Sequence, residues 1–250
     1  MQKYFISEEE FNLNQIKSDD AFHIANVMRC RVNDNVLVGY NNKTYLVKLT
    51  NITNKMVTFE IVKEETGVHE LPVFVTIFQG YPKGDKLDDI IKHSTELGVY
   101  EIIPTIMKRS IFKLDTKKLE SKLIRFNKIA KEAAEQSFRD YVPNIPSIKY
   151  LKETDFSKFD KKILCYEESA KNNELVNFKN IISSLNKNDK VAILIGPEGG
   201  IDDSELTYLK DKGFVECALG PRILRTETAS FYCLSSISYE LELKKWKLDL

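Results

Sequence analysis

The sequence predicts an α/β protein in two parts, a small antiparallel β-barrel or sandwich followed by a larger domain on a parallel sheet. Before residue 70, short runs of alternating apolar residues are separated by Asn turns, which is typical of hairpins. After Pro72, runs of strand length alternate with segments of helical periodicity, which indicates a parallel sheet covered on both faces. We place the boundary within residues 65–72 and expect domains at residues 1–70 and 71–250.

The first domain is expected to be mostly β-structure. Its predicted strands are VLVGY, KTYLVKL and MVTFEIV, at residues 36–40, 43–49 and 56–62. Ahead of them, residues 23–31 (HIANVMRCR) place apolar side chains at helical spacing and end in Arg29 and Arg31. This pattern predicts one short helix with a basic end.

The second domain is expected to alternate strands with helices. The predicted strands are residues 73–78, 101–106, 162–166, 191–195 and 215–219, and the predicted helices are residues 87–97, 117–137, 174–185, a segment after Asp202, and 226–243. Gly98 follows the first of these helices, as a C-terminal cap often does.

Composition excludes several classes of protein. Hydrophobic residues make up 42% of the 250 residues, which excludes global disorder. The longest apolar stretch, residues 191–195, is far shorter than the roughly 20 residues of a membrane-spanning helix. No secretory signal is visible at the amino end, so we expect a cytoplasmic protein. The four cysteines form no CxxC pair, which suits reduced thiols, and we predict no metal.

The charge is balanced overall but not locally. The chain carries 37 basic and 37 acidic residues, so any nucleic-acid surface must be a local patch. Residues 108–139 hold ten Lys and Arg against four Asp and Glu. This segment could contact phosphate, or it could be a solvated helix face with ion pairs at three- and four-residue spacing.

Two glycine-containing loops are the best candidates for a ligand site. Residues 196–200 (GPEGG) directly follow the most apolar strand, where open α/β sheets place their ligand crevice. They match neither the P-loop nor the dinucleotide fingerprint, and alone they could be a tight turn. Residues 219–229 (LGPRILRTETA) form a second such loop, in which Thr226 is the predicted N-cap of the last helix. Side by side, the two loops would make a backbone-lined slot able to bind a purine ring.

Four ordered motifs resemble one family. They are KGDKLDDIIKHSTELGV (83–99), RFNKIAKEAAEQSFRDYVPNI (125–145), IGPEGG (195–200) and LGPRILRTETA (219–229). Together they resemble the RsmE family of 16S ribosomal RNA (uracil-N3)-methyltransferases, which are knotted SPOUT methyltransferases. Residues 23–36 also resemble the amino-terminal PUA-like RNA-binding barrel of that family. Asn33 stands where the family typically has glycine, but Asn tolerates a positive φ, so we expect the turn to be kept.

The resemblance implies a fold, a cofactor and partners. It implies a carboxy-terminal α/β domain with a deep trefoil knot, S-adenosylmethionine bound in a bent form by the knot loops, and a homodimer whose interface completes each active site. It implies methylation of N3 of a specific uridine in 16S ribosomal RNA of the small subunit. The cofactor-binding residues carried over are Ile195, Gly196, Glu198, Gly199, Gly200, Leu219, Gly220, Ile223, Leu224 and Arg225.

The catalytic candidates are Arg225, Glu198 and Glu227. The proton on uracil N3 must leave, but the three histidines lie outside both ligand loops, and only His93 is kept in reserve. Glu198 or Glu227 could accept the proton, or either could cap a helix or pair with an arginine. We favour the alternative in which Arg225 or Arg222 stabilises charge on the uracil oxygens while water takes the proton.

RNA contacts are expected on both domains. The candidate phosphate ligands are Arg29, Arg31, Lys83, Arg109, Arg125 and Arg139. Such contacts position the RNA, and the target base must be splayed out to reach the slot. Two alternatives stay open: a knotted methyltransferase that acts on another RNA, and a non-catalytic RNA-binding or ribosome-assembly factor.

Overall fold

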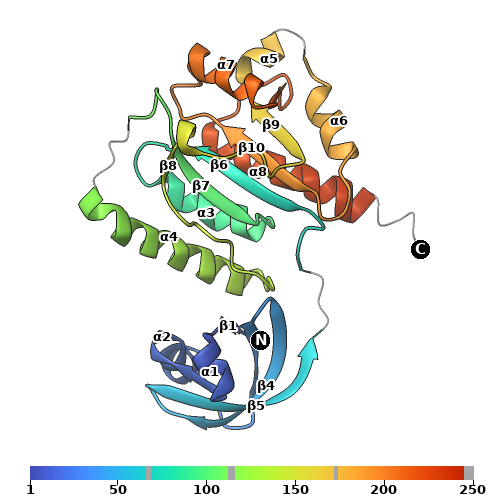
Figure 1. Cartoon of the computed structure of the whole chain (residues 1–250). Helices are drawn as coiled ribbons and strands as arrows, with labels where there is room; N and C mark the ends of the chain where they lie inside the picture. The colour runs from blue at the N-terminus through green and yellow to red at the C-terminus, as the bar shows by residue number, and fades with distance from the viewer. Residues whose placement is uncertain (66–68, 112–115, 172–173, 245–250) are drawn as a thin grey trace. The chain divides into compact units, whose positions relative to one another are not determined.

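A computed structural model gives the structure of the chain (Figure 1) and describes residues 1–65, 69–111, 116–171 and 174–244. The contacts divide it into two units. The first unit contains residues 1–70 and 134–142, and the second contains residues 71–133 and 143–250. Among the described residues, no helix is both long enough and apolar enough to cross a bilayer.

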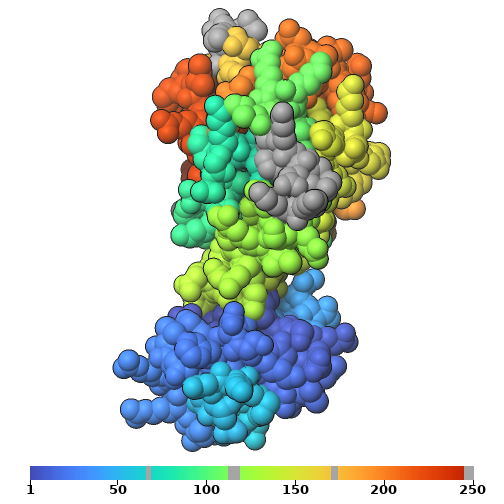
Figure 2. Space-filling model, turned by 90° about the vertical axis from the view of Figure 1, so that its left-hand side faces the viewer, coloured from blue at the N-terminus to red at the C-terminus, as the bar shows by residue number. Residues whose placement is uncertain are grey.

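The first unit is a curled five-stranded sheet in the order β1-β3-β4-β5-β2. The strands are β1 (Lys3–Phe5), β2 (Gln15–Lys17), β3 (Asn35–Tyr40), β4 (Lys43–Ile52) and β5 (Met56–Glu65). The expected strands are confirmed as β3, β4 and β5, which pair antiparallel. Sequence patterning missed β1 and β2, because three residues are too few to show alternation. β2 nevertheless pairs with β5, and Figure 2 shows the cyan atoms of residues near 60 beside the dark blue amino end.

The short helix predicted at residues 23–31 is shifted towards the amino end. The helices of this unit are α1 (Glu8–Asn12), α2 (Ser18–Phe22) and a π-helical turn at His23–Val27. Ile24 is fully buried in the core of the sheet, as its helical spacing indicated. Arg29 leaves the helix with a φ of 52°, and Asn33 has a φ of 77°. The expectation that Asn33 would accept a glycine-like conformation is confirmed.

A buried ionic cluster attaches residues 134–142 to this sheet. The Lys3 ammonium lies 3.2 Å from a carboxylate oxygen of Asp140 and also donates to the Thr44 hydroxyl and the Arg139 carbonyl. The Arg139 guanidinium pairs with Glu70. Burial lowers the pKa of Lys3 despite its carboxylate partner, because the side chain is fully enclosed. Since buried charges are tolerated only when paired, the cluster holds this distant segment in place.

The second unit is a six-stranded sheet in the order β11-β9-β10-β6-β7-β8, in which each neighbouring pair is parallel. The strands are β6 (Phe74–Gly80), β7 (Glu101–Ile106), β8 (Lys149–Tyr150), β9 (Lys161–Cys165), β10 (Lys190–Ile195) and β11 (Val215–Cys217). The expected α/β class with a parallel sheet is therefore confirmed. β8 was not predicted, because it has only two residues.

Helices follow most of these strands along the chain. They are α3 (Lys86–Glu96), α4 (Thr116–Gln136), α5 (Glu167–Lys171), α6 (Asn177–Ser183), α7 (Asp203–Asp211) and α8 (Thr226–Ser238), with a 3-10 turn at Leu151–Glu153 and a π-helical end at Tyr239–Lys244. The predicted helix at residues 174–185 is the shorter α6. The predicted helix at 226–243 is α8 followed by the π-helical end.

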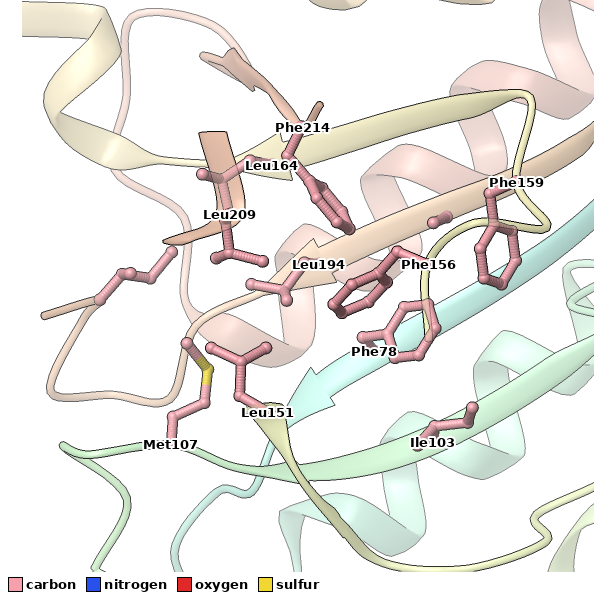
Figure 3. Packing of buried hydrophobic residues seen from close by; sticks show 12 residues of the cluster. Phe78, Ile103, Met107, Leu151, Phe156, Phe159, Leu164, Leu194, Leu209 and Phe214 are labelled. Atoms are coloured by element: carbon pink, nitrogen blue, oxygen red, sulfur yellow. The ribbon is translucent and has the colours of Figure 1, made fainter. Parts of the chain in front are cut away.

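Side chains of the central strands pack on both faces of the sheet. Phe78 of β6 and Leu194 of β10 point to one face, where they pack with Leu209 of α7 and a group of aromatic rings (Figure 3). On the opposite face, Gln79 of β6 and Cys165 of β9 contact α8. After the exposed Lys190, β10 is buried on both faces, so residues 191–195 are an unbroken apolar run with no polar alternation.

Replacing Asp140 by Ala is expected to lower the free energy of unfolding by about 3 kcal/mol, because the buried Lys3 ammonium loses its carboxylate. Urea unfolding monitored by circular dichroism measures the change. Lys43→Ala is the matched control, since it removes an exposed ion pair with Glu64 and should cost less than about 1 kcal/mol. Equal stability of the two variants would show that the cluster does not hold residues 134–142.

The contribution of Asp140 to the free energy of unfolding should decrease at low pH. Burial favours a higher pKa for Asp140, but hydrogen bonds from Thr44 and Lys3 outweigh it, so the pKa lies below its usual value. A lowered carboxyl pKa gives stability that is full above the unfolded pKa and is lost as pH falls through the folded pKa. The stability difference between wild type and Asp140→Ala should therefore shrink below about pH 4.

Candidate functional site

A pocket of about 370 Å³ lies where the strands β9, β10 and β11 end. This volume is within the range of small-molecule sites, roughly 300–1,000 Å³. The lining residues are Lys86, Cys165, Tyr166, Glu167, Ile195, Gly196, Pro197, Glu198, Gly200, Cys217, Ala218, Leu219, Gly220, Arg222, Ile223, Leu224, Arg225, Thr226 and Ala229. Its place at the carboxyl edge of a parallel sheet is the one that open α/β folds use for ligands.

Both predicted loops contribute to this pocket. Nine of the ten residues predicted to bind the cofactor line it, and Gly199 is the exception. A Cβ on Gly199 would instead meet Arg109, whose guanidinium donates to the Gly199 carbonyl at 3.3 Å. The role of the other nine in cofactor binding stays a prediction, because their place in the lining does not test it.

The backbone of the loops leaves room for a ligand. Gly220 has a φ of 104°, which side chains resist, and no atom lies within 4 Å of where its Cβ would be. Gly200 has a φ of 74°. A Cβ on Gly80 would overlap the backbone of Gly196 and Pro197, so glycine at this position lets the end of β6 pack directly against the first loop.

The start of α8 fixes both loops through buried hydrogen bonds. The Thr226 hydroxyl donates to the Gly196 carbonyl at 2.7 Å and accepts from the Gln79 side chain at 2.7 Å. The Ser230 hydroxyl donates to the oxygen of the same Gln79 amide. The prediction that Thr226 is the N-cap is wrong: Arg225 is the capping residue, and Thr226 is the first residue of α8. Its hydroxyl binds the neighbouring loop and not its own helix.

Carboxylates fix the ends of the two loops. Glu174 accepts from the backbone N–H of Ala218 at 3.0 Å and from two amides at the start of α6. Burial favours a higher pKa for Glu174, but these hydrogen bonds outweigh it and lower the pKa. Beyond the first loop, hydrogen bonds from Ser204 and Lys108 lower the pKa of Asp202, the N-cap of α7, to about 2.

One lysine lies between the two acidic catalytic candidates. The Lys86 ammonium lies 2.9 Å from Glu198 and 3.6 Å from Glu227. Burial favours a higher pKa for Glu198, but hydrogen bonds from Lys86 and the Lys83 backbone outweigh it and lower the pKa. A carboxylate held ionised in this way is a weak proton acceptor. Glu227 does not line the pocket, although one of its oxygens is buried without a hydrogen bond among the described residues.

The arginines of the second loop face open space. Arg222 and Arg225 line the pocket, and both side chains are exposed. Within the described part of the chain, neither has an ion-pair or hydrogen-bond partner, so both guanidinium groups are available to a ligand. By contrast, no histidine lines the pocket: His23 bonds to Tyr4, His69 to Asp140 and His93 to Glu96.

Five of the six predicted RNA contacts are exposed: Arg29, Arg31, Lys83, Arg109 and Arg125. Arg125 pairs with Asp88, which makes it part of an ion pair on the helix surface. Arg139 is 2% exposed and pairs with Glu70, so its guanidinium is not presented to a phosphate in this structure. Glu70 is remote in sequence, and the charge count therefore could not show this pairing.

Sequence analysis missed several lining residues. Cys165 ends β9 and is followed by Tyr166 and Glu167, and Cys217 ends β11 and is followed by Ala218. The rule that ligands bind at the carboxyl ends of neighbouring strands could have identified them, had the strand order been known. The sulfur atoms of Cys165 and Cys233 lie 3.5 Å apart, and their mutual hydrogen bond together with burial raises the pKa of Cys165.

The chain is similar to known RNA methyltransferases. A family described as an RNA methyltransferase domain matches residues 69–238, and an RNA methyltransferase PUA domain matches residues 16–62. The chain is 41% identical to ribosomal RNA small subunit methyltransferase E of Bacillus subtilis, over 97% of this chain and 98% of that protein. It is 34% identical to the protein of the same name from Mesomycoplasma hyopneumoniae, over 94% and 98%.

Solved structures agree with these sequence matches. The ribosomal RNA small subunit methyltransferase E of Neisseria gonorrhoeae, bound to S-adenosyl methionine, is 28% identical with a TM-score of 0.80. The match covers 95% of this chain and 97% of that one. A methyltransferase of Legionella pneumophila, also in complex with this cofactor, is 26% identical with a TM-score of 0.79, over 90% of each chain.

The parallel sheet, its carboxyl-edge pocket and these similarities define an S-adenosylmethionine-dependent RNA methyltransferase with an amino-terminal PUA domain. Within that class, the chain belongs to the RsmE family of ribosomal RNA small subunit methyltransferases. The family, fold class and cofactor expected from the motifs are thereby confirmed. The trefoil knot and the homodimer stay predictions.

Replacing Thr226 by Val is expected to lower the free energy of unfolding by about 1–3 kcal/mol and to weaken cofactor binding. The change keeps the side-chain shape but leaves the Gly196 carbonyl and the Gln79 amide without their buried partner. Thr228→Val, on an exposed position of the same helix, is the control and should change neither property. Chemical unfolding and calorimetric titration measure both. An unaltered cofactor affinity would mean that this hydroxyl does not position the loop.

Proposed function

We propose that this chain transfers a methyl group from S-adenosylmethionine to N3 of a specific uridine in 16S ribosomal RNA of the small subunit. The observation that carries the proposal is the pocket made by both glycine loops, with two unpartnered arginines at its second loop among the described residues. The relatives named ribosomal RNA small subunit methyltransferase E support the substrate class. Uridine and its N3 atom rest on the resemblance of the loop motifs.

The residues of the pocket fit the cofactor. Gly196 and Gly220 offer backbone that a nucleoside can approach closely, and the apolar side chains of Ile195 and Leu224 can enclose a purine ring. When bound, the cofactor supplies an activated methyl group on a positively charged sulfur. The protein therefore has to position the acceptor nitrogen in line and to stabilise the charge that develops on the base.

Arg225 is the proposed catalytic residue for that charge. Arg225 lines the pocket and is exposed, so its guanidinium can donate to a uracil oxygen as negative charge develops there. Glu198 is less suited to take the N3 proton, because Lys86 holds its pKa low. Glu227 pairs with the same lysine and does not line the pocket. In this scheme water accepts the proton, and the two glutamates position Lys86 at the pocket.

RNA binding is proposed on both units. Residues 1–70 are the proposed PUA-like RNA-binding barrel, and residues 71–250 the proposed catalytic domain. In the barrel, Arg29 and Arg31 are exposed, and so are Phe22 and Met28, which precede them in the chain, a combination that suits phosphate contact together with base stacking. The proposed phosphate contacts of the second unit are Lys83, Arg109 and Arg125.

A homodimer and a cytoplasmic location complete the proposal. Tyr239 and Leu243 at the π-helical end after α8 are 61% and 62% exposed, and Tyr232 of α8 is 40% exposed. Large apolar side chains gathered at an exposed helix are typical of an interface between copies. Sedimentation equilibrium tests it: a monomer at micromolar concentration would contradict the dimer. A ribosomal RNA substrate supports the proposed cytoplasmic location.

Replacing Arg225 by Ala is expected to lower the single-turnover rate at saturating cofactor by about a hundredfold, as removal of one oxyanion donor does. Calorimetry should show a change in cofactor affinity of less than about threefold. Lys187→Ala, at an exposed position outside the pocket lining, is the control for loss of a positive charge and should leave the rate unchanged. Loss of cofactor binding with an unchanged rate at saturation would make Arg225 a cofactor ligand.

Mass spectrometry of nuclease fragments identifies the product, and a methyl group elsewhere than on uridine N3 would contradict the proposed substrate.

Changing Arg29 and Arg31 together to Ala should weaken binding of 16S ribosomal RNA and reduce its salt dependence. Log affinity falls as log salt rises, and each lost phosphate contact makes this slope less steep by about 0.7–0.9. Filter binding between about 50 and 200 mM salt measures the slope. Lys55→Ala, in the exposed turn between β4 and β5, is the control for loss of charge in the first unit. An unchanged slope for the double variant would remove these arginines from the RNA surface.

A further inference from the structure

Glu167 lines the pocket but has no role in the reaction described above. It follows the last residues of β9 as the first residue of α5, and its side chain is exposed. Within the described part of the chain, its carboxylate has no hydrogen bond and no ion pair. The other acidic residue of the pocket lining, Glu198, is paired with Lys86.

The first glycine loop makes room for this carboxylate. A Cβ on Gly200 would lie 3.0 Å from Oε1 of Glu167, closer than side chains normally pack. Gly200 also has a φ of 74°, which a residue with a side chain would resist. The carboxylate therefore lies beside the backbone of the loop, in a position that glycine at residue 200 keeps open. Its place in the pocket follows from packing between β9 and the loop after β10.

The charges of the lining make Glu167 distinctive. Arg222 and Arg225 bring positive charge to the pocket, and the charge of Glu198 is balanced by Lys86. Among the lining residues, Glu167 is therefore the available negative group. S-adenosylmethionine carries an ammonium group and a ribose diol, both of which donate hydrogen bonds that an ionised carboxylate accepts strongly. An RNA phosphate, in contrast, would be repelled by this side chain.

We propose that Glu167 is a cofactor-binding residue whose carboxylate accepts hydrogen bonds from a donor group of S-adenosylmethionine, either the ammonium or the ribose hydroxyls. The inference rests on the proposed function, since it assumes that the pocket binds this cofactor. It assigns the end of β9 to cofactor binding, beside the two loops that the sequence motifs identified. Glycine at residue 200 then has two effects: it allows the positive φ of the loop, and it leaves space for the Glu167 carboxylate.

The experiment is calorimetric titration of the full-length protein with S-adenosylhomocysteine and, separately, with methylthioadenosine, which keeps the ribose but lacks the amino acid. Glu167→Ala and Glu167→Gln should each bind S-adenosylhomocysteine about tenfold to a hundredfold more weakly than wild type, as loss of a charged hydrogen bond predicts. If the Glu167 variants lose affinity for methylthioadenosine by the same factor, the partner of the carboxylate is the ribose. If the variants bind methylthioadenosine as tightly as wild type does, the partner is the ammonium. Asp211→Ala, an exposed acid of α7 outside the pocket, controls for the lost charge.

Two outcomes separate this inference from the proposed function. If wild type binds S-adenosylhomocysteine and both Glu167 variants bind it within twofold of wild type, Glu167 is not a ligand and the inference is overturned, while the methyltransferase function stands. If wild type itself does not bind the nucleoside, the proposed function fails first. The thermal midpoint of each variant without ligand shows whether it folds, and the near-isosteric Glu167→Gln gives the result if Glu167→Ala is unstable.

Discussion

The pocket depends on a small set of buried hydrogen bonds at the start of α8. Gln79, at the end of β6, is fully buried, so its amide must find partners inside the protein. It finds them in Thr226 and Ser230, and Thr226 also reaches the Gly196 carbonyl of the first loop. One satisfied network thus joins a central strand, a ligand loop and the last helix. Because an unpaired buried amide is costly, the network fixes where the second loop ends and α8 begins.

Charge in the second unit is arranged locally, although the chain as a whole is neutral. Lys86 pairs with Glu198 of the pocket lining and with Glu227 outside it. Glu174 accepts hydrogen bonds from a backbone amide of α6 and from that of Ala218, just before the second loop. These pairings remove most of the charge that would compete with a ligand. The exposed arginines of the second loop and Glu167 lie in the same pocket. The pocket therefore offers a ligand both positive charge, from the two arginines, and negative charge, from Glu167.

The first unit shows how distant residues can complete a small sheet. Its core is built from residues 1–65, but the end of α4 and the segment after it belong to the same unit. Lys3 is enclosed, and its ammonium finds a carboxylate in Asp140, which is more than 130 residues away. Glu135 accepts the Phe5 amide at 2.9 Å, which satisfies a donor on the edge strand β1. Burial of the Lys3 charge explains the first contact, since a buried ammonium is unstable without a partner.

The sequence by itself determined the two-part α/β organisation, most strands, both ligand loops and the family, because hydrophobic period and glycine-rich motifs are local properties. It could not show that Arg139 is buried against Glu70, that Gly199 faces Arg109, or that Thr226 bonds across to Gly196. Nor could it show that the ends of β9 and β11 join the pocket, because this follows from the strand order β11-β9-β10. These features depend on pairings between residues far apart in the chain, and only the tertiary structure, through burial and the need to satisfy polar groups, decides which partners meet.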